Sequence, residues 1–245
     1  MVAAVAAGTE SLAAPPELSL LQERATACTR CRLAETRTQV VFGSGSPQAP
    51  LMFVGEAPGF HEDKNGVPFV GAAGKLLERL LGEIGLARQD VYIANVLKCR
   101  PPGNRDPQPD EIESCSEWLL GQIALIRPTL ICTLGNFATK LLSNKPDGIT
   151  RVHGVPQDVT LGGMPVRLFP IYHPAAALYT PAMLKVLEED FRKLPGLLAA
   201  AGVVLAAPVA APPAAAPAAV AAPLAPATAA AAGAPAADTG QLGLF

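Results

Sequence analysis

Short apolar runs alternate along the chain with longer segments in which apolar residues recur at helical spacing. Uniformly apolar runs are typical of strands in a parallel sheet whose two faces are both covered. Apolar residues three or four positions apart predict helices with one buried face. The predicted strands are 51–54, 91–95, 129–134 and 166–172. The predicted helices are 16–27, 74–85, 109–126, 136–142 and 181–198.

This alternation predicts an α/β fold, with three layers in α/β/α order around a mostly parallel central sheet of about four strands. Ligands of such sheets bind beyond the carboxyl ends of the strands. Three loops follow predicted strands at that edge, namely 55–59, 95–105 and 173–174. We therefore expect the functional site where these three strand ends meet.

A long segment near the C-terminus differs in composition from the rest. From Ala199 to Ala237, 30 of 39 residues are alanine or proline, and no charged residue occurs between Lys193 and Asp238. Its frequent prolines exclude a membrane-spanning helix and favour a disordered or polyproline-like linker. The expected organisation is a flexible N-terminus at 1–15, a folded domain at 16–198, a linker at 199–240 and a distinct terminal segment at 241–245.

The charges are nearly balanced, with 19 lysines and arginines against 21 aspartates and glutamates. This balance excludes binding of nucleic acid through a general basic surface and leaves room only for a local basic patch. The candidates are Lys98, Arg100, Arg105 and Arg151, for which a solvated charged face is the alternative. The N-terminal apolar run lacks a preceding basic residue, so we expect no secretory signal and a cytoplasmic protein.

The five cysteines divide into one and four. Cys132 lies inside an apolar strand, which predicts a core thiol. The other four lie in loops or at helix starts, where their side chains can turn toward a shared centre. Four thiolates suit a zinc ion or an iron–sulfur cluster, and the dispersed second pair favours the cluster without excluding zinc. These four are Cys28, Cys31, Cys99 and Cys115.

An ordered series of motifs links the cysteines to the loops at the strand ends. It consists of Cys28-x2-Cys31, Gly55-Glu-Ala-Pro-Gly59 with Glu62-Asp63, Pro68-Phe-Val-Gly71, Val91-Tyr-Ile-Ala-Asn95, Lys98-Cys-Arg-Pro-Pro102 with Asn104-Arg105, Cys115 and His173-Pro174. The series resembles the family 4 uracil-DNA glycosylases, the iron–sulfur enzymes of bacteria and archaea, from about residue 19 to 198.

The resemblance implies a 4Fe–4S cluster on the four cysteines. It also implies a monofunctional glycosylase that hydrolyses the N-glycosidic bond of uracil in DNA, leaving an abasic site for base excision repair. A related branch that becomes covalently attached to its substrate carries a basic insertion after the second strand. Asn95 leads directly into Lys98 without such an insertion, which favours ordinary turnover. The first motif also differs from the Gly-Asp-Ala-Pro form of family 5.

Two residues are candidates for the chemical step. Cleavage of the bond requires a flipped base and stabilisation of positive charge on the sugar and negative charge on the departing uracil. By resemblance, Glu56 stabilises the sugar cation or orients a water, and His173 donates a hydrogen bond to uracil O2. A helix-capping carboxylate and a structural histidine are the alternatives.

The resemblance places Ala57, Glu62, Phe69 and Asn95 against the base. Glu62 would close the pocket beside uracil C5, where the methyl group of thymine would clash. Phe69 would stack on the base, and Asn95 would pair with O4 and N3–H, an arrangement that leaves cytosine mispaired. The alternatives are a solvated loop acid, a core anchor and a residue that fixes a turn.

Leu178 ends a segment that matches the DNA-intruding loop of the family and is a candidate wedge between bases. His61 and His153 have no matching role, and we expect both in loops or at the surface.

The last five residues form a motif unlike the linker before them. Gln241, Leu242, Leu244 and Phe245 resemble the pentapeptide with which bacterial proteins bind the sliding clamp. Such a tether would raise the local concentration of the enzyme at newly copied DNA. An arbitrary apolar end is the alternative.

Together these features predict a monomeric, nucleoid-associated bacterial enzyme that acts on uracil-containing DNA and does not enter membranes. The competing hypothesis is a non-enzymatic iron–sulfur protein of the same fold that binds DNA or associates with the clamp.

Overall fold

The four predicted strands form the centre of a six-stranded sheet in the computed structural model, which describes residues 14–203. The strand order is β1-β3-β2-β4-β6-β5, and the four central strands are parallel. They are β3 (Tyr92–Asn95), β2 (Leu51–Gly55), β4 (Leu130–Leu134) and β6 (Met164–Ile171). The predicted α/β fold with a mostly parallel sheet is confirmed.

The prediction of about four strands was incomplete, because two antiparallel edge strands flank the parallel set. They are β1 (Ser44–Gly45) and β5 (Gln157–Leu161). β1 has only two residues in a glycine- and serine-rich loop, and the residues of β5 alternate between partly buried and exposed. Neither forms an apolar run, so the pattern that revealed the central strands was missing from both.

The five predicted helices are present, with shifts of a few residues at their ends. They are α1 (Pro16–Thr26), α3 (Ala72–Glu83), α4 (Pro109–Ile126), α5 (Asn136–Ser143) and α8 (Pro181–Ala200). Three further helices are too short to show a helical period. They are α2 (Phe60–Asn65), α6 (Ile149–Val152) and α7 (Pro174–Ala177). Short 3₁₀ turns occupy Arg32–Glu35, Arg88–Asp90 and Pro102–Asn104.

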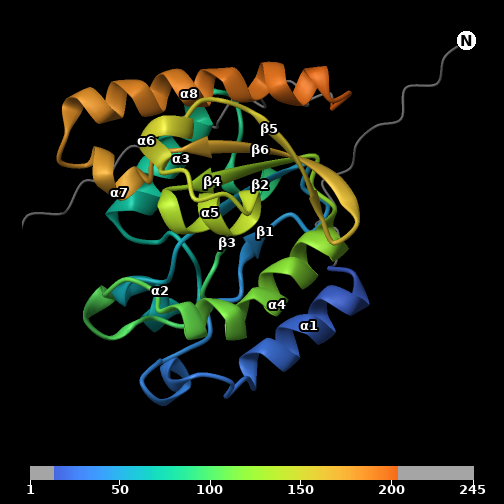
Figure 1. Cartoon of the computed structure of the whole chain (residues 1–245), viewed down its shortest axis with the longest axis vertical. Helices are drawn as coiled ribbons and strands as arrows, with labels where there is room; N and C mark the ends of the chain where they lie inside the picture. Colours follow the sequence, from blue (N-terminus) through green and yellow to red (C-terminus); the bar gives the residue numbers. More distant parts are fainter. Residues whose placement is uncertain (1–13, 204–245) are drawn as a thin grey trace, which may run out of the picture. The chain divides into compact units, whose positions relative to one another are not determined.

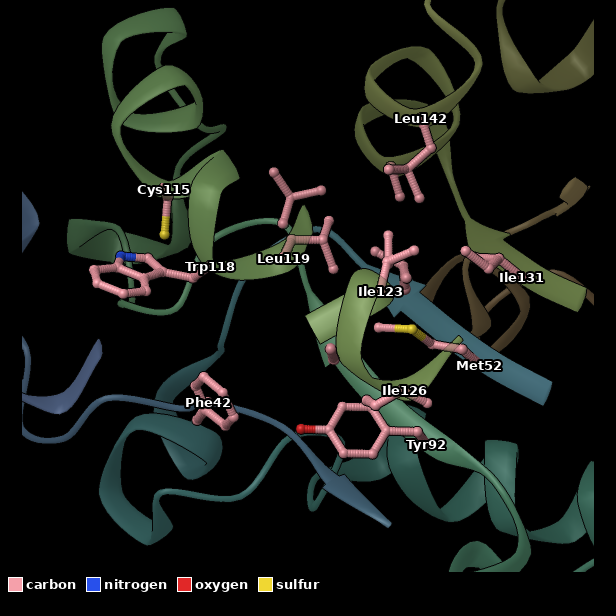
Figure 2. Packing of buried hydrophobic residues seen from close by; sticks show 14 of the residues in the cluster. Phe42, Met52, Tyr92, Cys115, Trp118, Leu119, Ile123, Ile126, Ile131 and Leu142 are labelled. Atoms are coloured by element: carbon pink, nitrogen blue, oxygen red, sulfur yellow. The ribbon is translucent and has the colours of Figure 1, made fainter. Parts of the chain in front are cut away.

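Helices cover both faces of the sheet, with α8 along one side and α4 and α1 on the other (Figure 1). Successive side chains of a strand point to opposite faces, so β2 contributes to two cores. Met52 lies beside Ile123 of α4 in the core shown in Figure 2, which also contains Trp118 and Leu119. On the other face, the Phe53 ring stacks on Phe191 of α8, with their centroids 5.7 Å apart.

The parallel strands are added on both sides of β2, so the chain changes direction across the sheet at this strand. The chain passes from β2 to β3 on one side and then returns through α4 to β4 on the other side of β2. Such a switch point separates the loops that leave neighbouring strands and opens a crevice at their carboxyl ends. Gly55 and Asn95, the last residues of β2 and β3, are paired across the two strands at this edge.

Helix α8 ends at Ala200, two residues beyond the predicted end of the domain at 198. Within residues 14–203, no helix combines the length and apolar character needed to cross a bilayer. Most of the predicted linker and the terminal motif at 241–245 lie outside the described residues, as do residues 1–13 of the predicted flexible N-terminus.

Candidate active site

A cavity of about 340 Å³ opens at the carboxyl ends of β2, β3 and β6, and we call it the site cavity. This volume lies in the range typical of small-molecule sites. The predicted catalytic and base-binding residues come from four separate segments of the chain, and all of them line it. They are Glu56, Ala57, Glu62, Phe69, Asn95 and His173.

Asn95 presents an unsatisfied acceptor to the site cavity. Its side chain is 1% exposed, and among the described residues its Oδ1 is the one buried side-chain polar atom without a hydrogen-bond partner. Leaving such an atom unpaired costs about 1–3 kcal/mol. A ligand that donates a hydrogen bond to this oxygen would remove the cost.

Gly55 keeps the space beside Asn95 open. A Cβ atom at this position would lie 2.4 Å from Asn95 Oδ1 and 2.8 Å from the nearest ring atom of Phe69. Both distances are shorter than van der Waals contact. The missing side chain thus leaves a cradle between an amide and an aromatic ring, a shape that suits a flat polar ring.

Phe69 forms the aromatic wall of the site cavity. The ring is buried and stacks on the imidazole of His173, with centroids 5.5 Å apart and an interplanar angle of 29°. Glu62 fixes the loop on one side, because its Oε1 accepts hydrogen bonds from the N–H groups of Val70 and Gly71, each at 3.0 Å. The alternative of a solvated loop acid for Glu62 is therefore wrong.

His173 is held as a neutral ring with a defined tautomer. Its Nδ1 accepts a hydrogen bond of 3.1 Å from the N–H of Ala175, which leaves the proton on Nε2. Burial lowers the pKa of His173 to about 4, although the Glu62 carboxylate acts in the opposite direction. The imidazole is therefore a neutral hydrogen-bond donor at neutral pH.

Glu56 follows β2 directly and is half-buried at the wall of the site cavity. Its backbone oxygen accepts a hydrogen bond of 3.0 Å from the N–H of Leu97, which joins the two loops that leave β2 and β3. Burial raises the pKa of the Glu56 carboxyl, and the negative charge of Asp106 raises it further. A raised pKa makes the carboxylate a better proton acceptor near neutral pH.

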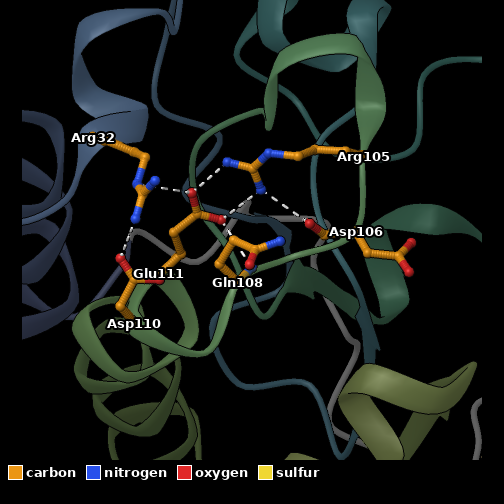
Figure 3. Close-up of polar contacts among 6 residues, drawn as sticks. All are labelled: Arg32, Arg105, Asp106, Gln108, Asp110 and Glu111. Atoms are coloured by element: carbon orange, nitrogen blue, oxygen red, sulfur yellow. Dashed lines mark hydrogen bonds and ion pairs between the residues drawn. The ribbon is translucent and has the colours of Figure 1, made fainter.

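A paired charge network supports the opposite wall of the site cavity (Figure 3). The Arg105 guanidinium binds the buried carboxylate of Glu111 through two hydrogen bonds of 2.6 and 2.9 Å and donates a third to the carbonyl of Asp106. The same carboxylate accepts a bond from the N–H of Gln108. Arg105 lines the site cavity with its charge already neutralised, and its contact with DNA stays a prediction.

The prediction of Lys98 as a phosphate contact is wrong. The residue is 1% exposed, and its ammonium donates hydrogen bonds to the carbonyl of Asn95 at 2.8 Å and to Oε1 of Gln122 at 2.6 Å. Burial lowers its pKa to about 8. Lys98 thus anchors the backbone of Asn95 from inside the protein and has no surface to offer to DNA.

The other predicted DNA contacts lie nearer to solvent, and their role stays a prediction. The Arg100 guanidinium lies 5.2 Å from the ring centre of Phe60, an exposed residue of α2. Arg151 is exposed on α6. Leu178 is partly exposed after α7, and Tyr179 beside it is 88% exposed.

The two histidines without a predicted role do not line the site cavity. His61 is exposed on α2. His153 is only partly at the surface, because its Nδ1 lies 3.3 Å from an oxygen of the buried Asp190 and its ring packs on Tyr172.

The four non-core cysteines line a second cavity, which we call the cysteine cavity. The N–H of Lys98 donates to Cys115 Sγ at 3.2 Å, and the Arg37 guanidinium donates to Cys99 Sγ at 3.5 Å. Arg30 lines the same cavity, so three cationic side chains surround the thiols. Burial raises the pKa of the Cys115 thiol to about 11. Cys132 lies in the core, fully buried in β4.

The four cysteines fit a group that is bound by several thiolates. On binding, the thiols would lose their protons, and the nearby cations Arg30, Arg37 and Lys98 would stabilise the resulting negative charge. In the part of the chain that the structure describes, no three cysteine, histidine or acidic side chains converge as ligands of a single metal ion. The arrangement is four thiols around one space rather than a closed single-ion site.

Two residues important to the site were not assigned a role from sequence. Asn104 lines the site cavity and its Oδ1 accepts a bond of 2.6 Å from Arg100. Its presence in the quoted motif was the available signal. Arg88 contacts the Phe69 loop from 19 positions away, and no local pattern marked it.

Several known proteins that this chain resembles are uracil-DNA glycosylases. The family model described as the Uracil DNA glycosylase superfamily matches residues 42–194. The type-4 uracil-DNA glycosylase of Saccharolobus solfataricus is 48% identical over 193 residues, which cover 77% of this chain and 89% of that protein. Those of Sulfurisphaera tokodaii and Archaeoglobus fulgidus are each 50% identical and cover 72% and 68% of this chain, and 83% and 86% of their own length.

The chain belongs to the type-4 uracil-DNA glycosylases. The resemblance drawn from the ordered motifs is thereby confirmed. Two predictions test the cradle between Asn95 and Phe69 and the charge near Glu56 separately.

Gly55→Ala should lower the glycosylase rate by about 100-fold, because the new methyl group would occupy the space beside Asn95 Oδ1 and the Phe69 ring. Single-turnover cleavage of a uracil-containing oligonucleotide measures the effect. Gly82→Ala is the matched control, since a Cβ there meets nothing within 4 Å and should leave the rate unchanged. Wild-type activity of Gly55→Ala would contradict the cradle.

Asp106→Asn should extend activity to lower pH. The Asp106 carboxylate raises the pKa of Glu56, so its removal lowers that pKa and keeps Glu56 ionised in more acidic solution. Single-turnover rates between about pH 4 and 8 measure the shift of the acid limb, which should be larger at low salt. Asp110→Asn, which removes a carboxylate paired with Arg32, should leave the limb in place. An unchanged limb in Asp106→Asn would exclude Glu56 as its origin.

Proposed function

We propose that this chain hydrolyses the N-glycosidic bond of deoxyuridine in DNA, releasing uracil and leaving an abasic site. One observation carries the proposal: the buried, unpaired Oδ1 of Asn95 beside the cradle formed by Gly55 and Phe69. The N3–H of uracil is the donor that this oxygen lacks. The type-4 relatives are named for the same activity.

Recognition follows from the polarity of the amide at Asn95. Its Oδ1 accepts from N3–H, and its amide N–H can donate to O4 of the same base. Cytosine presents an acceptor at N3 and a donor at C4, so both contacts would be mispaired and Asn95 would stay unsatisfied. The base must leave the duplex to reach this position, because Asn95 is buried at the end of its strand.

The chemical step is assigned to His173 and Glu56, which line the site cavity together with Asn95 and Phe69 of the cradle. The bond between C1′ and N1 breaks, and its electron pair leaves with uracil. The neutral His173 donates its Nε2 proton in a hydrogen bond to O2, where negative charge develops. A water oxygen bonds to C1′, and the Glu56 carboxylate stabilises the cationic sugar and accepts the proton of that water.

Exclusion of thymine is assigned to the loop between Glu62 and Phe69. Two hydrogen bonds from the backbone to Glu62 hold this loop against the site cavity. A rigid wall cannot move away from the extra methyl group at C5. In this proposal the carboxylate of Glu62 acts through the loop that it fixes, and its direct position beside C5 stays a prediction.

A 4Fe–4S cluster bound by Cys28, Cys31, Cys99 and Cys115 is part of the proposal. When bound, it would supply iron–thiolate bonds that cross-link the segment after α1, the segment after β3, and α4. The three cationic side chains around the cysteine cavity would balance the negative charge of a four-thiolate cluster. Zinc is the second candidate, and the dispersed positions of Cys99 and Cys115 favour the cluster.

The non-enzymatic hypothesis has less support. A binding module that had merely kept the fold would not need the set of a carboxylate, a neutral imidazole and an unpaired amide around one cavity. All three are present and line the site cavity.

Binding of a sliding clamp through Gln241, Leu242, Leu244 and Phe245 rests on their sequence pattern alone. These residues lie outside the described range, and the proposal is independent of the glycosylase activity.

The activity is tested with the cluster-loaded protein and a labelled oligonucleotide that contains one uracil, followed by alkali. Wild-type protein should produce a strand break at uracil, and oligonucleotides with cytosine or thymine at that position should stay intact. Asn95→Ala should reduce the rate by about 100-fold or more because the base loses its directional contacts. Asn65→Ala, a change on the exposed end of α2, should have no effect.

An intact oligonucleotide after incubation with loaded wild-type protein would refute the proposed activity. Cleavage that survives in Glu56→Ala and His173→Ala would refute their assigned roles while leaving the activity in place.

Elemental analysis tests the cluster. We expect about four iron atoms and four sulfide ions per chain in protein purified without oxygen. Cys115→Ala should lose the iron and unfold at a lower temperature, because its segment is no longer cross-linked. Cys132→Ala, a core thiol outside the cysteine cavity, should retain the iron. Zinc in place of iron would overturn the cluster proposal.

A further inference from the structure

Arg88 contacts the loop that carries Phe69 from outside the site cavity. The residue lies in the 3₁₀ turn Arg88–Asp90, just before β3. Its guanidinium donates hydrogen bonds to the carbonyl of Phe69 at 2.9 Å and to the carbonyl of Pro68. Two further bonds of 3.2 Å reach Ser44 Oγ and an oxygen of Glu78. Its side chain is 22% exposed.

The backbone that Arg88 holds is strained. Phe69 has a φ of 54°, a left-handed conformation that is uncommon for a bulky residue and persists only where surrounding contacts impose it. Gly74 of α3 packs against the same carbonyl so closely that a Cβ atom there would lie 1.8 Å from Phe69 O. The orientation of the Phe69 ring therefore depends on contacts made by its own peptide groups.

Two side chains divide these peptide groups between them. Glu62 accepts hydrogen bonds from the N–H groups that follow Phe69, and Arg88 donates to the carbonyls at and before it. We call Glu62 and Arg88, with their four hydrogen bonds to this turn, the clamp. Of the two residues, Glu62 alone lines the site cavity.

We propose that Arg88 is a positioning residue that holds Phe69 in the conformation needed to stack on a flipped base. This inference deepens the proposed function and rests on it. Without the guanidinium, the carbonyls of Pro68 and Phe69 lose their hydrogen-bond donor. The φ angle of Phe69 can then relax toward negative values. The ring would then leave its place beside His173 and Gly55, and the base would lose its aromatic wall.

The shape of the guanidinium explains why an arginine occupies this position. Its planar fork presents donors in fixed directions and can serve two neighbouring carbonyls together with Ser44 and Glu78. A lysine has the same charge but only a single flexible ammonium. The ion pair with Glu78 lies at the surface and contributes little by itself, so the carbonyl contacts are the functional part.

The test is a double-mutant cycle with Arg88→Met and Phe69→Ala in cluster-loaded protein. Arg88→Met should lower the single-turnover rate by about tenfold or more, because small displacements of a positioned group have large effects on rate. In the Phe69→Ala background, the same change should alter the rate by less than about twofold, because there is no ring left to position. Arg88→Lys should fall between wild type and Arg88→Met.

Arg79→Met is the matched control, since it removes an arginine from α3 that pairs with Glu83 and Glu188 at the surface. It should keep the wild-type rate. If Arg88→Met matches this control, or lowers the rate equally with and without Phe69, the residue has no positioning role and the inference is overturned. If Arg88→Met does not fold, the comparison of Arg88→Lys in the two backgrounds decides in the same way.

A second readout is independent of activity. Hydrogen exchange of the Val70 and Gly71 amides, which are bonded to Glu62, should be faster in Arg88→Met than in wild type or Arg79→Met. Unchanged exchange would overturn the clamp. Faster exchange in a protein that never cleaves uracil-DNA would refute the proposed function and leave the clamp standing, so the two failures are distinguishable.

Discussion

Lys98 links the site cavity to the cysteine cavity, through its buried ammonium on one side and its backbone N–H on the other. The ammonium donates to the carbonyl of Asn95 and to the side chain of Gln122, while the N–H of the same residue donates to Cys115 Sγ. Gln122 in turn donates to the hydroxyl of Tyr92 in β3. A hydrogen bond to a charged group contributes about 1.5–3 kcal/mol, so each of these contacts is costly to lose. The base-reading strand end, helix α4 and the cysteine cavity are therefore constrained together.

Beyond this constraint, the site is built by neighbouring parallel strands that end at one edge. Gly55 and Asn95 are paired across β2 and β3, which places a residue without a side chain beside an amide that lacks a partner. The sheet supplies this pairing without any loop flexibility. The loops then add the aromatic ring, the imidazole and the carboxylate, each fixed by bonds to backbone groups. The rigid sheet sets the position of the polar contact, and the clamped loops set its selectivity.

The two faces of the Phe69 loop illustrate how strain is supported at a binding site. A left-handed backbone at a phenylalanine is unfavourable in isolation. Here it is offset by a carboxylate that accepts two N–H groups and a guanidinium that donates to two carbonyls. The Glu62 carboxylate and the Arg88 guanidinium thus fix the Phe69 ring through hydrogen bonds to the backbone of its turn. In the proposed function, selection of the base therefore depends in part on Arg88, which lies outside the site cavity.

The sequence by itself determined the parallel core, the five long helices, the candidate residues around the site cavity and the separation of Cys132 from the other cysteines. These features follow from local periodicity and contiguous motifs. Only the tertiary structure showed that Lys98 is internal and that Arg88 reaches the Phe69 loop. It also added the edge strands β1 and β5. The reason is physical: burial and hydrogen-bond pairing depend on partners distant in the chain, and the segment Lys98-Cys99-Arg100 has the same local pattern whether Gln122 or water contacts the lysine ammonium.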